Sequence, residues 1–247
     1  MKVTVLGGFG TAGAPVAAAA RAAGHDVEAA SRRTGADVLR GEGLDVAFSG
    51  TEVVIDAFNH FAMSAAKAVR AHQAAAENIL AAAGRQGVAH VVLLSIVGVD
   101  RNPKNYYAGK AAQEKVYEAS DVPHTIQRVT QFHEFAPQLL ERTGAGPLAL
   151  APTGRVQPVG AHEAAQRLLR VAEDQPQGRR RDYAGPQEES LSQMVKAYAR
   201  ATGRRGPVIP ARMPVPMFRG LRRGLNLPSA EADRGMQTFG QWLEEQL

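Results

Sequence analysis

The segment YYAGK at residues 106–110 carries the two side chains of this sequence that are best placed for proton transfer. Tyr106 and Lys110 are four residues apart, so a helix through this segment would place both on one face. A free tyrosine has a pKa of about 10, and a nearby ammonium group lowers that pKa because it favours the phenolate. The spacing therefore predicts that Tyr106 can give a proton to a carbonyl oxygen, with Tyr107 as an alternative donor.

Further polar residues lie within or just after apolar segments and could join this chemistry. Ser95 lies near the end of VAHVVLLSIVGV, residues 88–99, and could hydrogen-bond a substrate carbonyl. His133, in TQFHEF, could donate a proton or bind a substrate, because histidine titrates near neutral pH. The alternative is that His133 is a polar residue in the first turn of a helix. Asp56, inside the apolar segment TEVVIDAF, is expected to be a hydrogen-bonded structural group.

The remaining histidines and the lack of cysteine narrow the chemistry. No histidine has the spacing of a metal ligand set, and only His60 is expected near a cavity. Without cysteine the chain has no thiolate nucleophile, disulfide or cysteine-bound metal. We therefore expect no metal site.

A glycine-rich turn near the start of the chain predicts a dinucleotide site. In GGFGTAG, Gly7, Gly10 and Gly13 recur every third residue, between a predicted strand and a predicted helix. In the dinucleotide fingerprint one glycine makes the tight turn, one lets the backbone approach the pyrophosphate, and one lets the helix pack on the strand. The helix N-terminus then offers unpaired N–H groups to the phosphates. The alternative is a tight turn with only a structural role.

Ser31, Arg32 and Arg33 lie where such folds distinguish NAD from NADP. An Asp or Glu about 20 residues after the glycines accepts a hydrogen bond from the ribose 2′-hydroxyl of NAD, whereas an arginine accommodates the 2′-phosphate of NADP. A serine hydroxyl and a guanidinium group can bind that phosphate, and a carboxylate would repel it. The segment therefore favours NADP(H), unless both arginines are only surface charges.

Apolar and helical segments alternate through the first 150 residues, as in a parallel sheet covered on both faces. This pattern predicts an α/β fold with a Rossmann-type doubly wound parallel sheet. Strands are expected at 2–7, 25–31, 51–58, 88–99 and 122–130, and helices at 11–24, 63–87 and 106–120.

Residues 151–247 are expected to form a small α+β region that packs on the Rossmann domain of residues 1–150 and covers the substrate. Short strands are expected at 154–160 and 179–185, and helices at 161–174 and 189–203. The segment 206–228 contains five prolines and is expected to be an irregular loop. Its apolar part MPVPMF would cover the site, and an arginine from 212–223 could meet an anionic group.

Composition indicates an ordinary globular protein of 247 residues, with 45% hydrophobic and 6% aromatic residues. So few aromatic residues argue against a single-stranded nucleic-acid platform. The net charge of +5 arises in residues 151–247, which hold 15 Lys/Arg and 10 Asp/Glu; we expect these arginines to be solvated rather than to bind nucleic acid. No apolar run reaches the about 20 residues that span a bilayer, and MKVTVLGG does not resemble a signal peptide. A cytoplasmic protein with no membrane partner is expected.

Six segments run in order over most of the chain: VTVLGGFGTAG, GEGLDVAFSGTEVVIDAFN, VVLLSIVGVDR, YYAGKAAQEKVYEASDVPHTIQRVTQFHEF, VQPVGAHEAA and YAGPQEESLSQMVKAY. They resemble the atypical branch of the short-chain dehydrogenase/reductase superfamily, the NmrA-like NAD(P)H-binding proteins. The resemblance implies a Rossmann domain with a small C-terminal substrate region and an NADPH-linked role. It supplies no substrate, because members range from reductases to redox-sensing regulators without turnover.

The resemblance also implies where a cofactor would lie. The pyrophosphate would lie against Phe9, Gly10, Thr11 and Ala12, the 2′-phosphate against Arg32, and the adenosine along Ala57, Phe58 and Asn59. The nicotinamide ribose would lie beside Ser95 and Ile96, with its hydroxyls within reach of Lys110. The nicotinamide would be bordered by Thr130, Gln131 and Phe132. Tyr106 and Lys110 correspond to the superfamily's Tyr-x-x-x-Lys arrangement, although Ser95 precedes Tyr106 by slightly less than the usual interval. His162 replaces an aspartate that is usual in related sequences, which leaves open whether the C-terminal region makes an acidic contact.

Several functions stay open at this point. The leading hypothesis is an NADPH-dependent reductase that transfers hydride to a small carbonyl, enone or quinone-like substrate. The second is a non-catalytic NADP(H) sensor that binds a partner. An isomerase or epimerase that uses the nicotinamide transiently is a third, and a nucleic-acid-binding role would depend only on the C-terminal arginines. The pattern does not distinguish a monomer from a homodimer.

Overall fold

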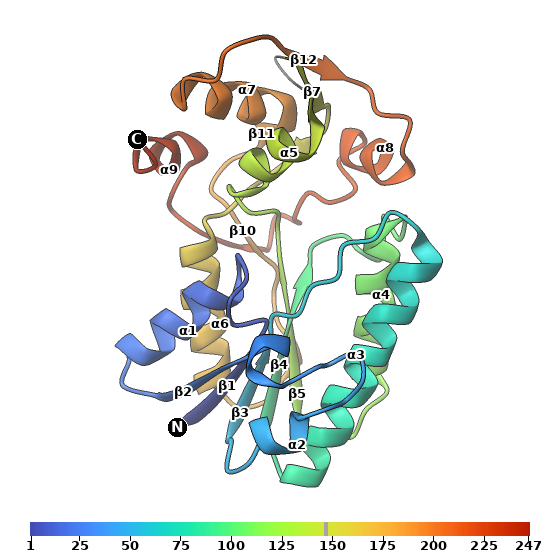
Figure 1. The fold of residues 1–247 in the computed structure, drawn as a ribbon, viewed down its shortest axis with the longest axis vertical. Coiled ribbons are helices and arrows are strands. Elements are labelled where there is room, and N and C mark those ends of the chain that lie inside the picture. The colour runs from blue at the N-terminus through green and yellow to red at the C-terminus, as the bar shows by residue number, and fades with distance from the viewer. Residues whose placement is uncertain (146–147) are drawn as a thin grey trace.

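A parallel sheet forms the centre of the lower of two lobes in the computed structural model, which describes residues 1–145 and 148–247 (Figure 1). The strands of this sheet, in spatial order, are β13 Asp233–Arg234, β10 Tyr183–Ala184, β5 His124–Val129, β4 His90–Ile96, β3 Val53–Asp56, β1 Lys2–Leu6 and β2 Asp26–Ala30, with β9 Gly178–Arg179 also paired to β5. All of these pairings are parallel. The predicted Rossmann-type doubly wound sheet is confirmed.

The chain reverses its direction of progress across the sheet at β1. From β1 it passes to β2 on one side, and then to β3 on the other side. Crevices that bind ligands in such sheets lie beyond the carboxyl ends of the two strands that flank this reversal. Here those ends are Leu6 and Asp56, which are paired in register.

Helices cover both faces of the sheet. On one face lie α2 Leu44–Ala47, α3 Ala65–Gln86 and α4 Tyr106–Glu118; on the other lie α1 Gly13–Ala22 and α6 Ala161–Glu173. Alternate strand residues enter opposite cores, because successive side chains of a strand point to opposite faces. Val54 packs with the α3 side, whereas Val53 and Val92 pack with α1 and α6.

The upper lobe is held by its own apolar core, centred on α5 Phe135–Thr143 and α7 Leu191–Ala201. It also contains two small sheets and two short helices: β6 Gly144–Ala145, β7 Leu148–Pro152 and β12 Val208–Ala211; β8 Arg155–Val156 and β11 Glu189–Ser190; α8 Pro216–Arg222 and α9 Phe239–Glu244. The prediction that 206–228 is an irregular loop is wrong in part. Residues 208–211 pair with β7, and Pro216 begins α8, a position where a missing N–H is tolerated.

The chain crosses between the lobes more than once, so a boundary at residue 150 does not separate them. Helix α5 precedes that residue and packs on α7 in the upper lobe. Helix α6 follows it and packs on α1 in the lower lobe, where Leu168 is fully buried. The apolar face of α6 covers one face of the sheet together with α1, and this burial explains why the chain returns to the lower lobe.

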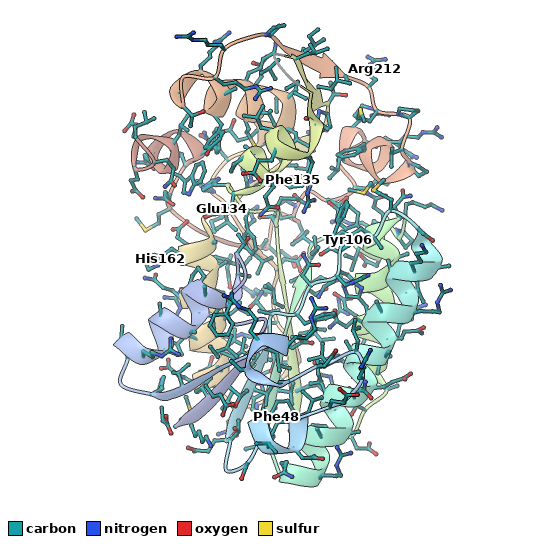
Figure 2. The ribbon with its side chains drawn as sticks, viewed as in Figure 1. Phe48, Tyr106, Glu134, Phe135, His162 and Arg212 are labelled. Carbon is teal, nitrogen blue, oxygen red and sulfur yellow. The ribbon has the colours of Figure 1, made fainter. Side chains whose placement is uncertain are left out.

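The start of α6 makes an acidic contact despite the histidine at position 162. Glu163 accepts hydrogen bonds from the backbone N–H groups of Met236 (2.7 Å) and Gln237 (3.3 Å). His162 is exposed on the outside of the lower lobe (Figure 2) and bonds Gln166. The neighbouring acid therefore joins the segment before α9 to the first turn of α6. Among the described helices, none is both long and apolar enough to cross a membrane.

Candidate functional site: a cavity between the lobes

The glycine turn lies at the carboxyl end of β1, against the end of β3. Gly7 has a φ of +68°, and a Cβ there would lie 2.8 Å from the carbonyl oxygen of Ala57. A Cβ on Gly13 would lie 2.2 Å from the carbonyl oxygen of Gly7, so this glycine lets α1 pack on the turn. A Cβ on Gly10 would have one close contact, 3.3 Å from the carbonyl oxygen of Gly7. No side chain caps α1, and uncapped N–H groups at a helix N-terminus can bind an anion.

The segment after β2 brings two arginines to the same crevice. Ser31 caps a short 3₁₀ helix, Arg32–Thr34, and its hydroxyl oxygen accepts from the N–H of Arg33. Arg33 lies over the ring of Phe9, 5.4 Å from its centroid. Both arginines are exposed, and no carboxylate in the described chain forms an ion pair with either. Their charge is therefore available to an anion in the crevice.

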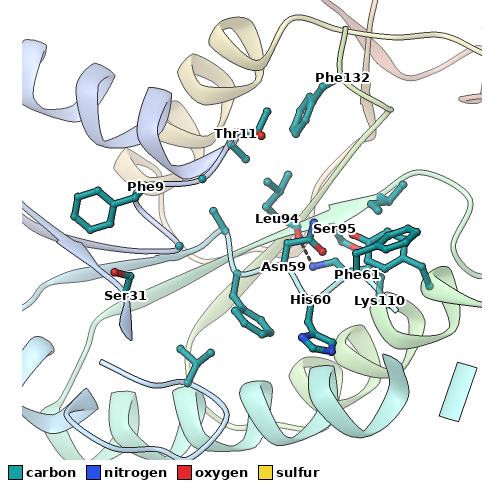
Figure 3. A pocket seen from close by; sticks show the side chains of 18 of the residues that line it. Phe9, Thr11, Ser31, Asn59, His60, Phe61, Leu94, Ser95, Lys110 and Phe132 are labelled. Carbon is teal, nitrogen blue, oxygen red and sulfur yellow. Dashed lines mark hydrogen bonds between the residues drawn. The ribbon is translucent and has the colours of Figure 1, made fainter. Parts of the chain in front are cut away.

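One cavity of about 680 Å³ joins this crevice to the junction between the lobes (Figure 3). Most predicted cofactor contacts line it: Gly7, Phe9, Gly10, Thr11, Ala12, Ser31, Arg32, Arg33, Ala57, Phe58, Asn59, Ser95, Ile96, Lys110, Thr130, Gln131 and Phe132. Gly13 is buried beneath the turn rather than in the wall. His60, the histidine expected near a cavity, also lines it. A volume of this size suits a ligand of several rings.

Lys110 lines the cavity, and its ammonium group begins a buried chain of hydrogen bonds. Its ammonium group donates to the carbonyl oxygen of Leu94 (2.8 Å), drawn as a dashed line in Figure 3, and to Gln113 Oε1 (2.6 Å). Gln113 and Tyr117 in turn donate to Asp56, at 2.8 and 2.9 Å. Asp56 is thus the hydrogen-bonded structural group that the sequence predicted. Burial lowers the pKa of Lys110 to about 8, although the charge of Asp56 acts to raise it.

A family model described as NAD(P)H-binding matches residues 7–151. The chain belongs to the NAD(P)H-binding family. The match covers the glycine turn, Arg32 and Arg33, and the hydrogen-bond chain of Lys110, and it ends within β7. No curated protein matches the sequence.

Solved structures of similar fold extend over almost the whole NAD(P)H-binding chain. A nucleoside-diphosphate-sugar epimerase from Staphylococcus aureus has 16% identity and a TM-score of 0.71, covering 99% of this chain and 100% of that one. A short-chain dehydrogenase/reductase superfamily protein from Agrobacterium tumefaciens with bound NAD has 15% identity, a TM-score of 0.67 and coverage of 99% and 95%. A dTDP-4-dehydrorhamnose reductase from Clostridium acetobutylicum has 17% identity, a TM-score of 0.67 and coverage of 100% and 92%. This likeness shows the fold, which is that expected for an atypical short-chain dehydrogenase/reductase.

The tyrosine pair of this NAD(P)H-binding protein differs from the expected arrangement. The ring of Tyr106 packs at tilted angles against Phe61 and Tyr107, with centroid distances of 5.4 and 5.6 Å. Burial raises the pKa of Tyr106, and the charge that acts to lower it belongs to Arg142. The prediction that Lys110 lowers the pKa of Tyr106 is therefore wrong, because the ammonium group is directed at Leu94 and Gln113.

Two predicted chemical groups are not available in the way the sequence suggested. Ser95 lines the cavity, but its hydroxyl oxygen is buried. His133 does not line the cavity. Its ring packs on Phe239 and Trp242 of α9, and its Nε2 bonds the carbonyl oxygen of Gln237 at 3.1 Å. His133 is thus a buried ring beside α9, and it precedes α5 instead of lying in its first turn.

The end of the cavity between the lobes includes four residues that the sequence did not single out, which are Phe61, Phe135, Gln138 and Arg142. Asp37 and its neighbours were likewise missed at the other end. The three from α5 recur at the spacing of one helix face, which is the signal that could have identified them. Met217, from MPVPMF, partly fulfils the predicted apolar cover. Arg212, however, lies at the outer edge of the upper lobe (Figure 2), and no arginine of 212–223 lines the cavity.

Asn105 fixes the start of α4 at this end. It is the non-glycine residue with a positive φ, +52°, among the described residues. Its side chain donates to the carbonyl oxygen of Met63 (2.9 Å) and accepts from the N–H of Met217 (3.1 Å). A strained residue persists only where its surroundings hold it in place. Asn105 thereby joins three segments around the tyrosine pair.

Proposed function

We propose that this chain is an NADPH-dependent reductase of a small carbonyl, enone or quinone-like substrate. The observation that carries the proposal is one continuous cavity, which runs from the glycine turn and the arginine pair to an aromatic end beside Lys110. NADPH, when bound, supplies a hydride for the electrophilic carbon and becomes NADP⁺. The remaining requirements are orientation of both molecules and a proton for the substrate oxygen, and these are tasks for the chain.

The preference for NADPH over NADH is supported by Arg32 and Arg33, which have no acidic partner in the described chain and are held by the Ser31 cap. A guanidinium group binds a phosphate through charge-assisted hydrogen bonds. Lys110, at the other end of the cofactor site, is proposed to hold the ribose hydroxyls, because its ammonium group is anchored at the wall of the cavity.

Tyr107 is the better supported proton donor of the two tyrosines. Its hydroxyl oxygen accepts from Gln131 Nε2 at 3.4 Å, and both residues line the cavity. Burial raises the pKa of Tyr107 to about 12, although the bond from Gln131 acts to lower it. The phenol is therefore protonated at neutral pH and can donate to a substrate oxygen that gains negative charge as hydride arrives.

The test is NADPH oxidation by the purified chain with a panel of benzaldehydes, enones and benzoquinones. We expect turnover with at least one class, a loss of about tenfold or more in kcat for Tyr107→Phe, and a smaller effect for Tyr106→Phe. His133→Gln is the matched control and is expected to retain activity. Tight NADPH binding without turnover of any compound would refute the reductase.

A non-catalytic NADP(H) sensor is the second candidate, and two observations favour it. The hydroxyl of Ser95 is buried, and His133 lies outside the cavity. A sensor requires only that the two redox forms bind differently. Equal affinity for NADP⁺ and NADPH, together with no change in the association of the chain, would exclude it.

A further inference from the structure

The end of the cavity between the lobes carries a positive charge on an apolar wall. Helix α5 presents Phe135, Gln138 and Arg142 to the cavity. Gln138 donates to Thr11 Oγ1 at 3.2 Å, which joins this helix to the glycine turn. Arg142 lies one turn further along, so the same helix face leads from the turn to the guanidinium group.

Arg142 is directed across the junction between the lobes. Its guanidinium carbon lies 4.6 Å from the ring centroid of Phe61, which belongs to the loop after β3. Arg142 forms no ion pair with any carboxylate in the described chain. Its position in the last turn of α5 suits the helix dipole, but the dipole does not require the side chain to reach a ring of the other lobe.

The charges that line the cavity are unevenly placed. Arg32, Arg33 and the one lining carboxylate, Asp37, belong to a single segment at the glycine-turn end. Lys110 is 3% exposed and is bonded to the chain itself. Arg142 is thus the exposed charge of the aromatic end, and no acidic residue lines the cavity beside it.

We propose that Arg142 binds a carboxylate group of the substrate, and that the substrate is a flat conjugated carbonyl compound. This inference rests on the proposed reductase function and names its substrate class. The rings of Phe61, Tyr106, Tyr107 and Phe135 form an apolar, aromatic wall that suits a planar ring. A guanidinium group matches a carboxylate with two parallel hydrogen bonds, and the pair is stronger in a partly apolar cavity than at an open surface.

The compound 4-formylbenzoate and its methyl ester together test the proposal, because they have almost the same shape and differ in charge. Reduction adds hydride to the aldehyde carbon and a proton to its oxygen, giving the hydroxymethyl compound and NADP⁺. We expect the acid to be used with a kcat/KM that exceeds that of the ester by about tenfold or more. Arg142→Ala is expected to remove this preference by raising KM for the acid, and to leave the kcat/KM for the ester within about twofold.

Arg200→Ala is the matched control, because Arg200 also lies in the last turn of an upper-lobe helix but outside the cavity. Arg142→Lys, which keeps the charge without the planar fork, is expected to recover only part of the preference. Equal use of acid and ester, or an equal effect of Arg142→Ala on both, would overturn the proposal while leaving the reductase intact.

Direct binding separates the two proposals if no compound is reduced. Titration of 4-formylbenzoate into the chain saturated with NADP⁺ should show binding that Arg142→Ala weakens by about tenfold. That result would support the carboxylate site even though the reductase had failed. Absence of binding would overturn the site. Stronger competition by uridine diphosphate than by benzoate would also overturn it, in favour of a nucleotide diphosphate.

Discussion

Replacement of Arg32 and Arg33 by alanine should abolish the preference for NADPH, so that NADPH and NADH bind with similar affinity. Both side chains extend from a short helix whose backbone is held by Ser31 and Thr34, with hydrogen bonds of 2.9 to 3.1 Å. The cap bonds involve backbone groups and not the guanidinium groups. Truncation should therefore remove charge at the crevice without releasing the turn that carries it.

The expected loss of NADPH binding free energy follows from the exposure of this short helix. Hydrogen bonds to charged groups contribute about 1.5–3 kcal/mol, and the exposed setting of Arg32 and Arg33 places the 2′-phosphate contact at the lower end. A loss of about 1.5–2 kcal/mol corresponds to about tenfold to thirtyfold weaker NADPH binding. NADH has no 2′-phosphate, so its affinity should change by no more than about twofold.

Calorimetric titration of NADPH, NADP⁺ and NADH into the wild-type chain and the double variant measures this difference. Arg40→Ala is the control, because Arg40 is an exposed arginine of the same segment that pairs with Glu42 and does not line the cavity. The NADPH affinity should also fall steeply with salt in the wild type and less so in the double variant. If the substitutions weaken NADPH and NADH equally, the arginines contact a part shared by both molecules and the reasoning fails.

Three further predictions concern packing and titration. In a denaturant titration, Gly109→Ala should lower the free energy of unfolding by about 1–3 kcal/mol, because a Cβ there would lie 2.6 Å from a buried histidine ring of α3. Gly84→Ala is the control. The Cβ at position 84 has its nearest contact at 3.7 Å, so this variant should raise the free energy of unfolding by about 0.5–1 kcal/mol. His133→Gln should lower the melting temperature and leave NADPH turnover within about twofold, and a larger loss of turnover would restore this histidine to the chemistry. Burial holds the pKa of Lys110 at about 8 instead of 10.5, so the folded chain binds fewer protons than the unfolded chain between these values and stability from this group rises with pH across that window. In denaturant titrations from pH 8 to 9.5, Lys110→Met should flatten this rise by up to about 2 kcal/mol, and an unchanged pH slope would contradict the cause.

The cofactor end of the cavity could be predicted because its determinants are local. Gly7, Gly10 and Gly13 belong to one turn, and Arg32 follows the very next strand. Each requirement concerns a backbone conformation or a close contact within a single βαβ unit, and such requirements restrict residue type at fixed spacing. The parallel sheet was predictable for a similar reason, since buried strands are short apolar runs between helices.

The chemical groups were harder to predict because their directions depend on tertiary packing. A helix through 106–110 does place Tyr106 and Lys110 on one side, but spacing does not show that Gln113 and Leu94 take the ammonium group first. The sequence around His133 likewise suits a proton donor or a polar residue in the first turn of a helix, and it does not show that the ring is buried. Its role is set by α9, more than a hundred residues away along the chain.

The end of the cavity between the lobes, where we propose that the substrate binds, has no sequence motif because no single segment forms it. Phe61 comes from the loop after β3, Tyr107 from α4, Arg142 from α5 and Met217 from α8. Asn105 links three of these segments through its two side-chain hydrogen bonds. A substitution in any one segment can therefore change the shape of the substrate end without touching the glycine turn. If the proposed function holds, this separation lets the fold keep its cofactor and exchange its substrate, and we expect α5 and α8, rather than the sheet, to decide specificity.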